Sequence, residues 1–460
     1  MNRSVHRRTR TAAAAVAALS LGVLAACSSS SSGSAGSTSS APAASSAAAT
    51  GSSTASAGTV STSSCGTKPG VAATGTPINL GAIDTKQPGT DFSDIENMTA
   101  AYFACVNANG GINGHPIKYF PVTEQTNPSQ IASLAKQLVT SDHVVGIVGN
   151  SSIIECSVDS AYWKSVGIDV LGAGIDPECW STPNTASVNM GPRYSSDGAV
   201  QYVMAQGANK IAFDQSNVPG TTYIADGPNA LAKAKGVAIQ DFTENVPITS
   251  ANAIATKLVT AAGPSGAVVL NFTPPEALLI LQAAQKLNLE DRVKYWACST
   301  PCNTDFLATS LGAKWNNKLF VNAELTPLDG NTSATAQLFD AILKQYGSAV
   351  SGGVGSFSEM GFVIGETATK ALEGITGPYT IASVSAALKG LSNYNTGLLC
   401  QGFTYGNYSE HIPNNMDYTV TPNNGKFVQA ANGGGCTLIS ASDPQIAAYR
   451  ALAGTAPAVG

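Results

Sequence analysis

The stretch Asn107-Ala-Asn-Gly-Gly-Ile-Asn-Gly-His-Pro-Ile117 holds the turn chemistry on which the fold of this chain depends. Its adjacent glycines, Gly110 and Gly111, suit the left-handed cap of a helix, because glycine adopts positive φ without a steric penalty. Asn113-Gly114 then supplies a tight turn into a following strand. The stretch therefore predicts a helix before it and a strand after it.

Short β-rich runs alternate with longer helical runs from residue 77 onward, which is typical of βαβ units and parallel sheets. The expected strands span residues 78–83, 144–148, 169–173, 210–213, 237–242, 267–271, 293–297 and 319–323. The expected helices span residues 94–107, 129–138, 196–204, 223–235, 252–261, 275–287, 334–346 and 360–372. The pattern predicts an α/β fold with doubly wound parallel sheets.

The length of the folded part, about 375 residues, exceeds what one hydrophobic core usually serves, so two lobes joined by a hinge are expected. The alternation breaks around residues 192–195 and 324–329, where the chain would cross between lobes. The expected boundaries are 76–193 plus 324–400 for lobe 1, 194–323 plus 401–450 for lobe 2, and 451–460 for a flexible tail. Ligands of open α/β sheets bind beyond the carboxyl ends of the strands, which predicts a cleft between the lobes.

The N-terminus reads as an export signal with a lipidation site. Arginines at positions 3, 7, 8 and 10 precede an apolar stretch too short to span a bilayer, and Leu24-Ala-Ala-Cys27 ends it. Residues 1–26 are therefore expected to be a signal peptide, and Cys27 the lipidated first residue of the mature protein. An ordinary secretory signal with an incidental cysteine is the alternative. Residues 27–75, rich in Ser, Ala and Gly, are expected to form a disordered tether.

The remaining eight cysteines are an even number in an exported chain, which favours disulfides. Eight cysteines allow 105 pairings. Pairing nearest neighbours in sequence gives Cys65–Cys105, Cys156–Cys179, Cys298–Cys302 and Cys400–Cys436. A metal site is not expected, because the four histidines are scattered and none lies near Cys298 and Cys302.

The composition and motifs give no support for an enzyme, a cofactor or a nucleic-acid partner. The net charge is −5, and no Lys/Arg cluster follows the signal. No nucleophile elbow, zinc-protease motif or P-loop is present. The Ser133-Leu-Ala-Lys136 match to S-x-x-K falls within an expected helix without its companion motifs, and Pro177 spoils the glycine pattern that begins at Gly172.

The turn at Asn107–Ile117 resembles the helix-to-strand turn of the branched-chain amino acid binding proteins, the type I periplasmic solute receptors of ABC importers. Four further segments match in order, and together they cover essentially the whole chain after residue 76. They are Asn127-Pro-Ser-Gln, Gly146-Ile-Val-Gly-Asn-Ser-Ser, Gly167-Ile-Asp-Val-Leu-Gly-Ala and Asn271-Phe-Thr-Pro-Pro-Glu. The resemblance implies the two-lobed type I binding fold.

In that family a serine and backbone groups of the first lobe hold the ligand carboxylate, and the resemblance puts these roles at Ser152 and Ala173. A threonine that helps to hold the ammonium falls at Ile175, and the second-lobe acid that pairs with it falls at or near Ser299. Ile175 has no side-chain hydrogen-bonding group, and Ser299 carries no charge to pair with an ammonium. Since a charge-assisted hydrogen bond contributes about 1.5–3 kcal/mol, a preference for leucine, isoleucine or valine is not expected.

Glu359 is a candidate replacement for the missing acid, with a helix N-terminal carboxylate as the alternative interpretation. Phe92, Tyr223 and Phe357 are candidates for apolar or stacking contacts, although simple packing is the interpretation that their positions favour. Gly174 and Thr273 complete the expected ligand-binding set, because both follow expected strands in the matched segments. For Ser152, a turn or helix cap remains the alternative.

The resemblance implies a lipid-anchored, extracytoplasmic, monomeric receptor that delivers a small organic solute to an ABC permease in the membrane. A carboxylate, an amide or an amino-acid-like molecule is the expected ligand. A ligand sensor of the same fold that signals to a receptor is the main alternative, and an enzyme acting on a small molecule is a less favoured one. No cofactor is expected.

Overall fold

The computed structural model describes residues 61–433 and 435–454. The expected signal peptide, Cys27, the tether up to residue 60 and tail residues 455–460 lie outside the described residues. In the described part of the chain, no helix has the length and apolar character needed to cross a membrane.

The first lobe is built on a six-stranded sheet whose centre is β1 (Ile78–Gln87). β1 pairs in parallel with two strands, one on each side, and the short β2 pairs antiparallel with its end. The remaining strands continue the parallel arrangement in the order β1-β4-β5-β6. These strands are β2 (Thr90–Asp91), β3 (Ile117–Glu124), β4 (Gly146–Asn150), β5 (Val170–Gly172) and β6 (Thr185–Ser187).

Helices cover both faces of this sheet. One face packs against α1 (Asp94–Ala108), α9 (Ala334–Tyr346) and α10 (Ser356–Glu373), with α11 (Ile381–Lys389) beside α10. The other face packs against α2 (Pro128–Thr140) and α3 (Glu155–Val166). The sheet is therefore doubly wound, as the sequence predicted.

The turn between α1 and β3 has the predicted geometry. Gly110 and Gly111 have φ values of 106° and 62°, and Asn113 and Gly114 have φ values of 51° and 91°. A Cβ on Gly111 would lie 2.3 Å from the carbonyl oxygen of His115. Both this clash and the positive φ exclude a side chain at this position. This turn returns the chain from the helix to the strand beside β1.

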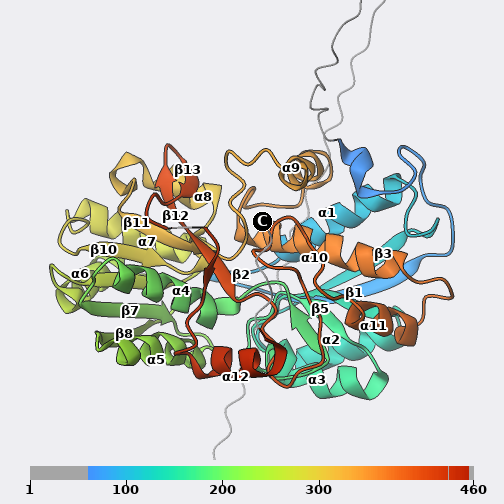
Figure 1. Ribbon diagram of the computed structural model, residues 1–460, viewed down its shortest axis with the longest axis horizontal. Coiled ribbons are helices and arrows are strands. Elements are labelled where there is room, and N and C mark those ends of the chain that lie inside the picture. Colours follow the sequence, from blue (N-terminus) through green and yellow to red (C-terminus); the bar gives the residue numbers. More distant parts are fainter. Residues whose placement is uncertain (1–60, 434, 455–460) are drawn as a thin grey trace, which may run out of the picture. The chain divides into compact units, whose positions relative to one another are not determined.

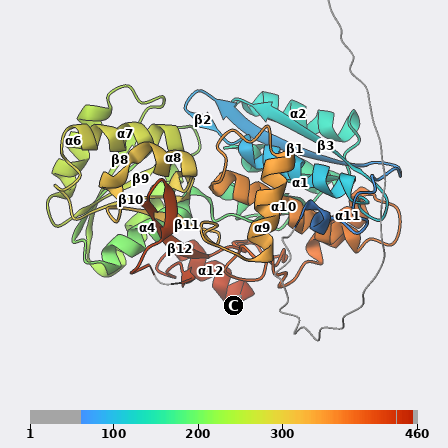
Figure 2. The ribbon, with the colours of Figure 1, turned by 90° about the horizontal axis from the view of Figure 1, so that it is seen from above.

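The second lobe contains an eight-stranded sheet in the order β13-β12-β11-β10-β9-β7-β8, and β14 pairs with β12. β7 to β11 are parallel, whereas β12 and β13 run antiparallel at one edge. The two sheets lie side by side in the ribbon views (Figure 1, Figure 2). The strands are β7 (Lys210–Ser216), β8 (Ala238–Glu244), β9 (Ala267–Asn271), β10 (Tyr295–Cys298), β11 (Leu319–Ala323), β12 (Met416–Asn423), β13 (Lys426–Gln429) and β14 (Thr437–Leu438).

The second sheet is also covered on both faces. α4 (Gly191–Ala205) and α5 (Asp226–Lys235) pack on one face. α6 (Ala251–Ala262), α7 (Pro274–Lys286) and α8 (Asp305–Leu311) pack on the other.

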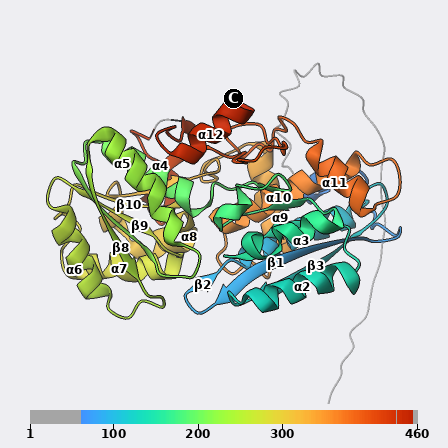
Figure 3. The same ribbon diagram turned by 90° about the horizontal axis from the view of Figure 1, so that it is seen from below.

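The chain passes between the lobes three times: between β6 and α4, between β11 and α9, and between α11 and β12. Residues 192–195, expected as an irregular crossing, instead form the first turn of α4, where Pro192 lacks an N–H that a helix start does not need. The C-terminal α12 (Pro444–Ala453) reaches into the region expected as a flexible tail. It packs near the crossings (Figure 3), where Arg193 Nε donates to the Asp443 carboxylate at 2.7 Å.

All four expected disulfides are present: Cys65–Cys105, Cys156–Cys179, Cys298–Cys302 and Cys400–Cys436. The first of them lies in a segment expected to be disordered. The backbone N–H groups of Lys68 and Ala73 donate to carbonyls at the end of α1, and residues 62–65 form a short 3₁₀ helix. Residues 61–75 therefore belong to lobe 1 rather than to the tether, because the disulfide and these bonds attach them to α1.

Candidate functional site

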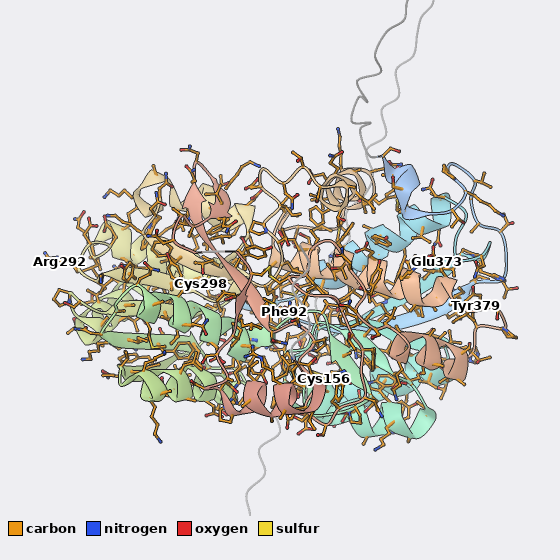
Figure 4. The ribbon with its side chains drawn as sticks, in the orientation of Figure 1. Phe92, Cys156, Arg292, Cys298, Glu373 and Tyr379 are labelled. Carbon is orange, nitrogen blue, oxygen red and sulfur yellow. A yellow bond between two sulfur atoms is a disulfide. The ribbon has the colours of Figure 1, made fainter. Side chains whose placement is uncertain are left out.

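A cavity of about 680 Å³, including the part that opens to solvent, is lined by residues of both lobes. The lining follows the carboxyl ends of the strands. The first sheet contributes Phe92 after β2, Ile153 after β4, and Ala173 and Ile175 after β5. The second sheet contributes Val218 after β7, Thr273 after β9, Thr300 after β10 and Glu324 after β11. Figure 4 shows Phe92 between the two lobes.

The cavity wall is mainly apolar. Phe92 and Phe357 meet edge to face, with ring centroids 5.3 Å apart. Ile153, Ile175 and Val218 form a small buried cluster that joins the two lobes. Such a wall favours a ligand with an apolar body and a few fixed polar groups.

A second cavity of about 1110 Å³ adjoins the first and shares Thr90, Thr273 and Phe357 with it. Its other lining residues come from the β1–β2 turn, the loop before α10 and the starts of α1, α7 and α8. The outer cavity therefore meets the inner one at the three shared residues.

The two lobes touch across the cleft. The Thr273 hydroxyl donates to the carbonyl oxygen of Gly89 at 3.0 Å, and the Tyr223 hydroxyl donates to the carbonyl oxygen of Ile175. Each bond joins one lobe to the other. The structure is therefore a closed arrangement of the lobes.

Replacing Thr273 with valine is expected to shift the lobes toward an open arrangement. The change removes the bond to Gly89, and a typical hydrogen bond contributes about 1 kcal/mol, so the ratio of open to closed molecules should rise about fivefold. Small-angle X-ray scattering of the protein would show a larger radius of gyration.

The matched control is Thr309→Val. Thr309 also donates to a glycine carbonyl, that of Gly425, at 3.1 Å, but both residues belong to lobe 2. The control should leave the radius of gyration unchanged, and Thr273→Ser should restore it. An equal change in both valine variants would contradict the assignment of the Thr273 bond to lobe closure.

Five of the residues expected to bind ligand line the inner cavity: Phe92, Ala173, Ile175, Thr273 and Phe357. The other five do not line it. They are Ser152, Gly174, Tyr223, Ser299 and Glu359.

The Ser152 hydroxyl is already hydrogen-bonded to another residue of the protein. Ser152 is buried, and its hydroxyl donates to Glu124 Oε1 at 2.9 Å. Glu124 also accepts hydrogen bonds from the Thr85 hydroxyl and from the backbone N–H groups of Thr126 and Asn127. The hydroxyl expected to hold a ligand carboxylate is thus directed at a buried carboxylate of the protein.

The remaining four lie behind the cavity wall. Gly174 N–H donates to the Ser187 hydroxyl, and Tyr223 bonds to Ile175 as described. Ser299 is fully buried, and its hydroxyl has no hydrogen-bond partner. Glu359 is buried on α10 and lines a separate cavity of about 260 Å³.

The sequence analysis missed several polar residues of the lining, of which two have an oxygen without a hydrogen-bond partner. Glu324 and Asn189 are both buried, and Glu324 Oε1 and Asn189 Oδ1 have no hydrogen-bond partner. Glu324 directly follows an expected strand, so the strand-end rule could have found it. Asn189 follows β6, whose three residues give too little pattern to predict.

Glu324 sits where the chain leaves lobe 2. Its Oε2 accepts from the backbone N–H of Met190 at the start of α4, at 2.6 Å. Burial raises the pKa of the Glu324 carboxyl to about 8, although the bond from Met190 opposes the shift. Burial also raises the pKa of Glu359 to about 8, and the nearby charge of Glu324 adds to that effect. Two carboxyl groups that resist ionisation thus lie at and behind this wall.

One group of metal-ligand types is close together in the described residues, Cys156, Asp176 and Cys179. Its two sulfur atoms are joined in a disulfide, so they are not thiolate ligands. The group therefore does not suit a metal ion.

Two doubly wound lobes, three crossings and a cavity at the facing strand ends define a two-lobed ligand-binding protein of type I periplasmic architecture. A family model described as periplasmic binding protein matches residues 77–426. The chain belongs to this family.

Solved structures share the fold. A possible leucine/isoleucine/valine-binding protein from Rhodopirellula baltica is 16% identical, with a TM-score of 0.66 over 77% of this chain and 96% of that one. A fatty acid ABC transporter substrate-binding protein from Thermomonospora curvata is 16% identical, with a TM-score of 0.67 over 84% and 97%. A branched-chain amino acid transporter substrate-binding protein from Streptococcus pneumoniae, in complex with isoleucine, is 16% identical, with a TM-score of 0.62 over 77% and 100%. No curated protein sequence matches the chain.

Proposed function

We propose that this chain is an extracytoplasmic solute-binding protein that captures a small organic solute between its lobes and delivers it to an ABC permease. The observation that carries the proposal is the inner cavity, which both lobes line at the carboxyl ends of their strands. The proposed ligand is a carboxylate, an amide or an amino-acid-like molecule with an apolar body.

The proposed mechanism is capture without reaction. A solute binds one lobe in the open state and favours closure, because only the closed state adds the contacts of the other lobe. The closed receptor is then recognised by the permease, whose ATPase supplies the energy of transport. No histidine, cysteine or lysine lines the inner cavity in the described part of the chain, which supports binding rather than catalysis.

Lipid on Cys27 is the proposed attachment to the membrane, and the protein is proposed to act as a monomer. The Leu24-Ala-Ala-Cys27 motif after an arginine-rich start supports the lipid. Mass spectrometry of membrane-extracted protein should detect a mature chain beginning at an acylated cysteine. Release of an unmodified protein into the medium would contradict the anchor.

A thermal-shift screen of the purified protein against organic acids, amides, amino acids and amines tests the proposed function. A ligand present at 100 times its dissociation constant should add about 2.7 kcal/mol to the free energy of unfolding. Ser216→Trp, at a half-buried position of the cavity wall, should abolish the shift, whereas the exposed Thr222→Trp should preserve it. No shift with any compound, or chemical conversion of a bound one, would contradict the proposal.

A further inference from the structure

In the wall of the inner cavity, most hydrogen-bond donors have partners within the protein, whereas two acceptors do not. Most of the cavity's side-chain donors are directed at acceptors of the protein itself, the hydroxyls of Thr90 and Ser216 being the exceptions. The bonds run from Asn189 to the Gly174 carbonyl, from Asn271 to Pro192 and Ser196, from Ser195 to Pro192, from Thr221 to Ser216 and Val218, from Thr273 to Gly89, and from Thr300 to Asn322.

The acceptor side of the cavity is different. Glu324 Oε1 and Asn189 Oδ1 are the two buried side-chain atoms of the described lining without a partner. The two residues are neighbours, because Met190, which follows Asn189 in the chain, donates its N–H to Glu324. Buried polar atoms are normally satisfied, so these two orphan oxygens favour a ligand that supplies donors once Glu324 is ionised.

The charges point the same way. No lysine, arginine or histidine lines the cavity in the described residues, and Glu324 is its one ionisable side chain. At the start of α4, the Met190 N–H already bonds to a carboxyl group of the protein, that of Glu324. Ser152, the expected partner of a ligand carboxylate, is bonded to Glu124. An organic anion would therefore find a carboxyl group and no countercharge.

We infer that this cavity binds an apolar amine, whose ammonium group lies against Glu324 and Asn189 while its hydrocarbon body packs on Phe92, Phe357 and Ile175. The inference rests on the solute-binding part of the proposed function and replaces the carboxylate, amide or amino-acid-like ligand with an amine. It assigns to Glu324, on the crossing from lobe 2, the acid role that sequence resemblance placed at Ser299. With the Ser152 hydroxyl bonded to Glu124, an amine without a carboxylate is favoured over an amino acid.

Binding is coupled to a proton. Burial raises the pKa of Glu324 to about 8 in the ligand-free protein, so the carboxyl is largely protonated at neutral pH. The ammonium ion is an opposite charge that favours the carboxylate, so the carboxyl proton leaves to solvent as the amine binds. Glu359 lies behind Glu324, and its own surroundings include Asp305 and Asp329, which Lys426 partly offsets. Asn414 contacts only the backbone carbonyl of Glu324.

The test uses four probes with one shared body: 4-phenylbutylamine, 4-phenylbutanamide, 4-phenylbutanol and 4-phenylbutanoate. Calorimetry at pH 7 should rank the amine first, at least about tenfold tighter than the alcohol and the carboxylate. The affinity of the amine should rise by up to about tenfold per pH unit between pH 6 and 8. Titrations in buffers of different ionisation enthalpy should show about one proton released per amine bound at pH 6.5.

Glu324→Gln should lower the amine affinity at least about tenfold, abolish the proton release and leave the alcohol unaffected. The matched control is Glu366→Gln, because burial also raises the pKa of Glu366 to about 8 but this residue does not line the cavity. Should Glu324→Gln fail to fold, proton release by the unaltered protein still decides the question.

Tightest binding of the carboxylate, or amine binding without proton release, would overturn the amine assignment. So would failure of all four probes when another solute without an N–H group stabilises the protein. Those outcomes leave the solute-binding function standing. Only the absence of binding by every solute in the thermal-shift screen would overturn both.

Discussion

Replacing Gly191 with alanine should remove about 2 to 5 kcal/mol from the free energy of unfolding, because positive φ and overpacking each cost an alanine about 1 to 3 kcal/mol. Gly191 has a φ of 73°, and a Cβ at this position would lie 2.1 Å from Cη2 of Trp180. Trp180 is fully buried and cannot move aside without disturbing its neighbours. The variant should also bind ligand more weakly, because Gly191 lines the cavity.

Gly236→Ala separates the two contributions. Gly236 has a φ of 68° at the end of α5, and a Cβ at this position would have no atom within 4 Å. This control should lose only about 1 to 2 kcal/mol, the penalty of the left-handed conformation. Chemical denaturation of both variants measures the difference. Equal losses would show that Trp180 does not confine the start of α4.

Raising the pH from 5.5 to 8.5 should destabilise the ligand-free protein by several kcal/mol. Burial raises the pKa of Glu155, Glu324 and Glu359 from 4.5 to about 8. The folded state therefore holds protons that the unfolded chain releases above pH 4.5. This stabilisation is complete below pH 4.5 and is lost as the pH rises through 8, at about 1.4 kcal/mol per pKa unit for each group.

His411 acts in the opposite direction at lower pH. Burial lowers the pKa of His411 to about 4, so between pH 6.5 and 4 the unfolded chain binds a proton at His411 and the folded protein does not. This difference lowers the free energy of unfolding as the pH falls. One histidine offsets only part of the effect of the three glutamates, so the melting temperature should rise as the pH falls from 8.5 to about 4.5, by about 5 to 10 °C between pH 8.5 and 5.5.

Glu155→Gln should flatten the alkaline part of this profile. Glu155 accepts a hydrogen bond from the indole of Trp163, and a glutamine oxygen can accept the same bond without titrating. The exposed Glu178 gives a matched control as Glu178→Gln. A melting temperature that does not change between pH 5.5 and 8.5 would contradict the burial of protonated acids.

The central strands of both sheets were predicted because they are buried on both faces and read as apolar runs, as β4 and β9 do. α3 was missed because its buried face carries Glu155 and Asp159 beside Trp163, so the apolar period is absent. Two other omissions had usable signals. Asn424-Gly425 marks the turn between β12 and β13, and Thr380, a residue type that favours helix N-caps, marks the start of α11.

The site was harder to predict than the fold. Strand ends located the cavity, since Ala173, Ile175 and Thr273 all line it. Which way a side chain turns depends on partners remote in sequence. The Ser152 hydroxyl instead bonds to Glu124, which is the last residue of β3 and therefore lies on a different strand.

Because residues 61–75 are attached to α1, this N-terminal segment moves together with lobe 1. Cys65–Cys105 makes this connection covalent, so whatever holds the N-terminus of the chain holds lobe 1. Lobe 2 is joined to that frame through the three crossings and, across the cleft, through bonds such as that from Thr273 to Gly89. When the cleft opens, the two lobes therefore move relative to each other about the three crossings, and residues 61–75 move with lobe 1 as part of the same body.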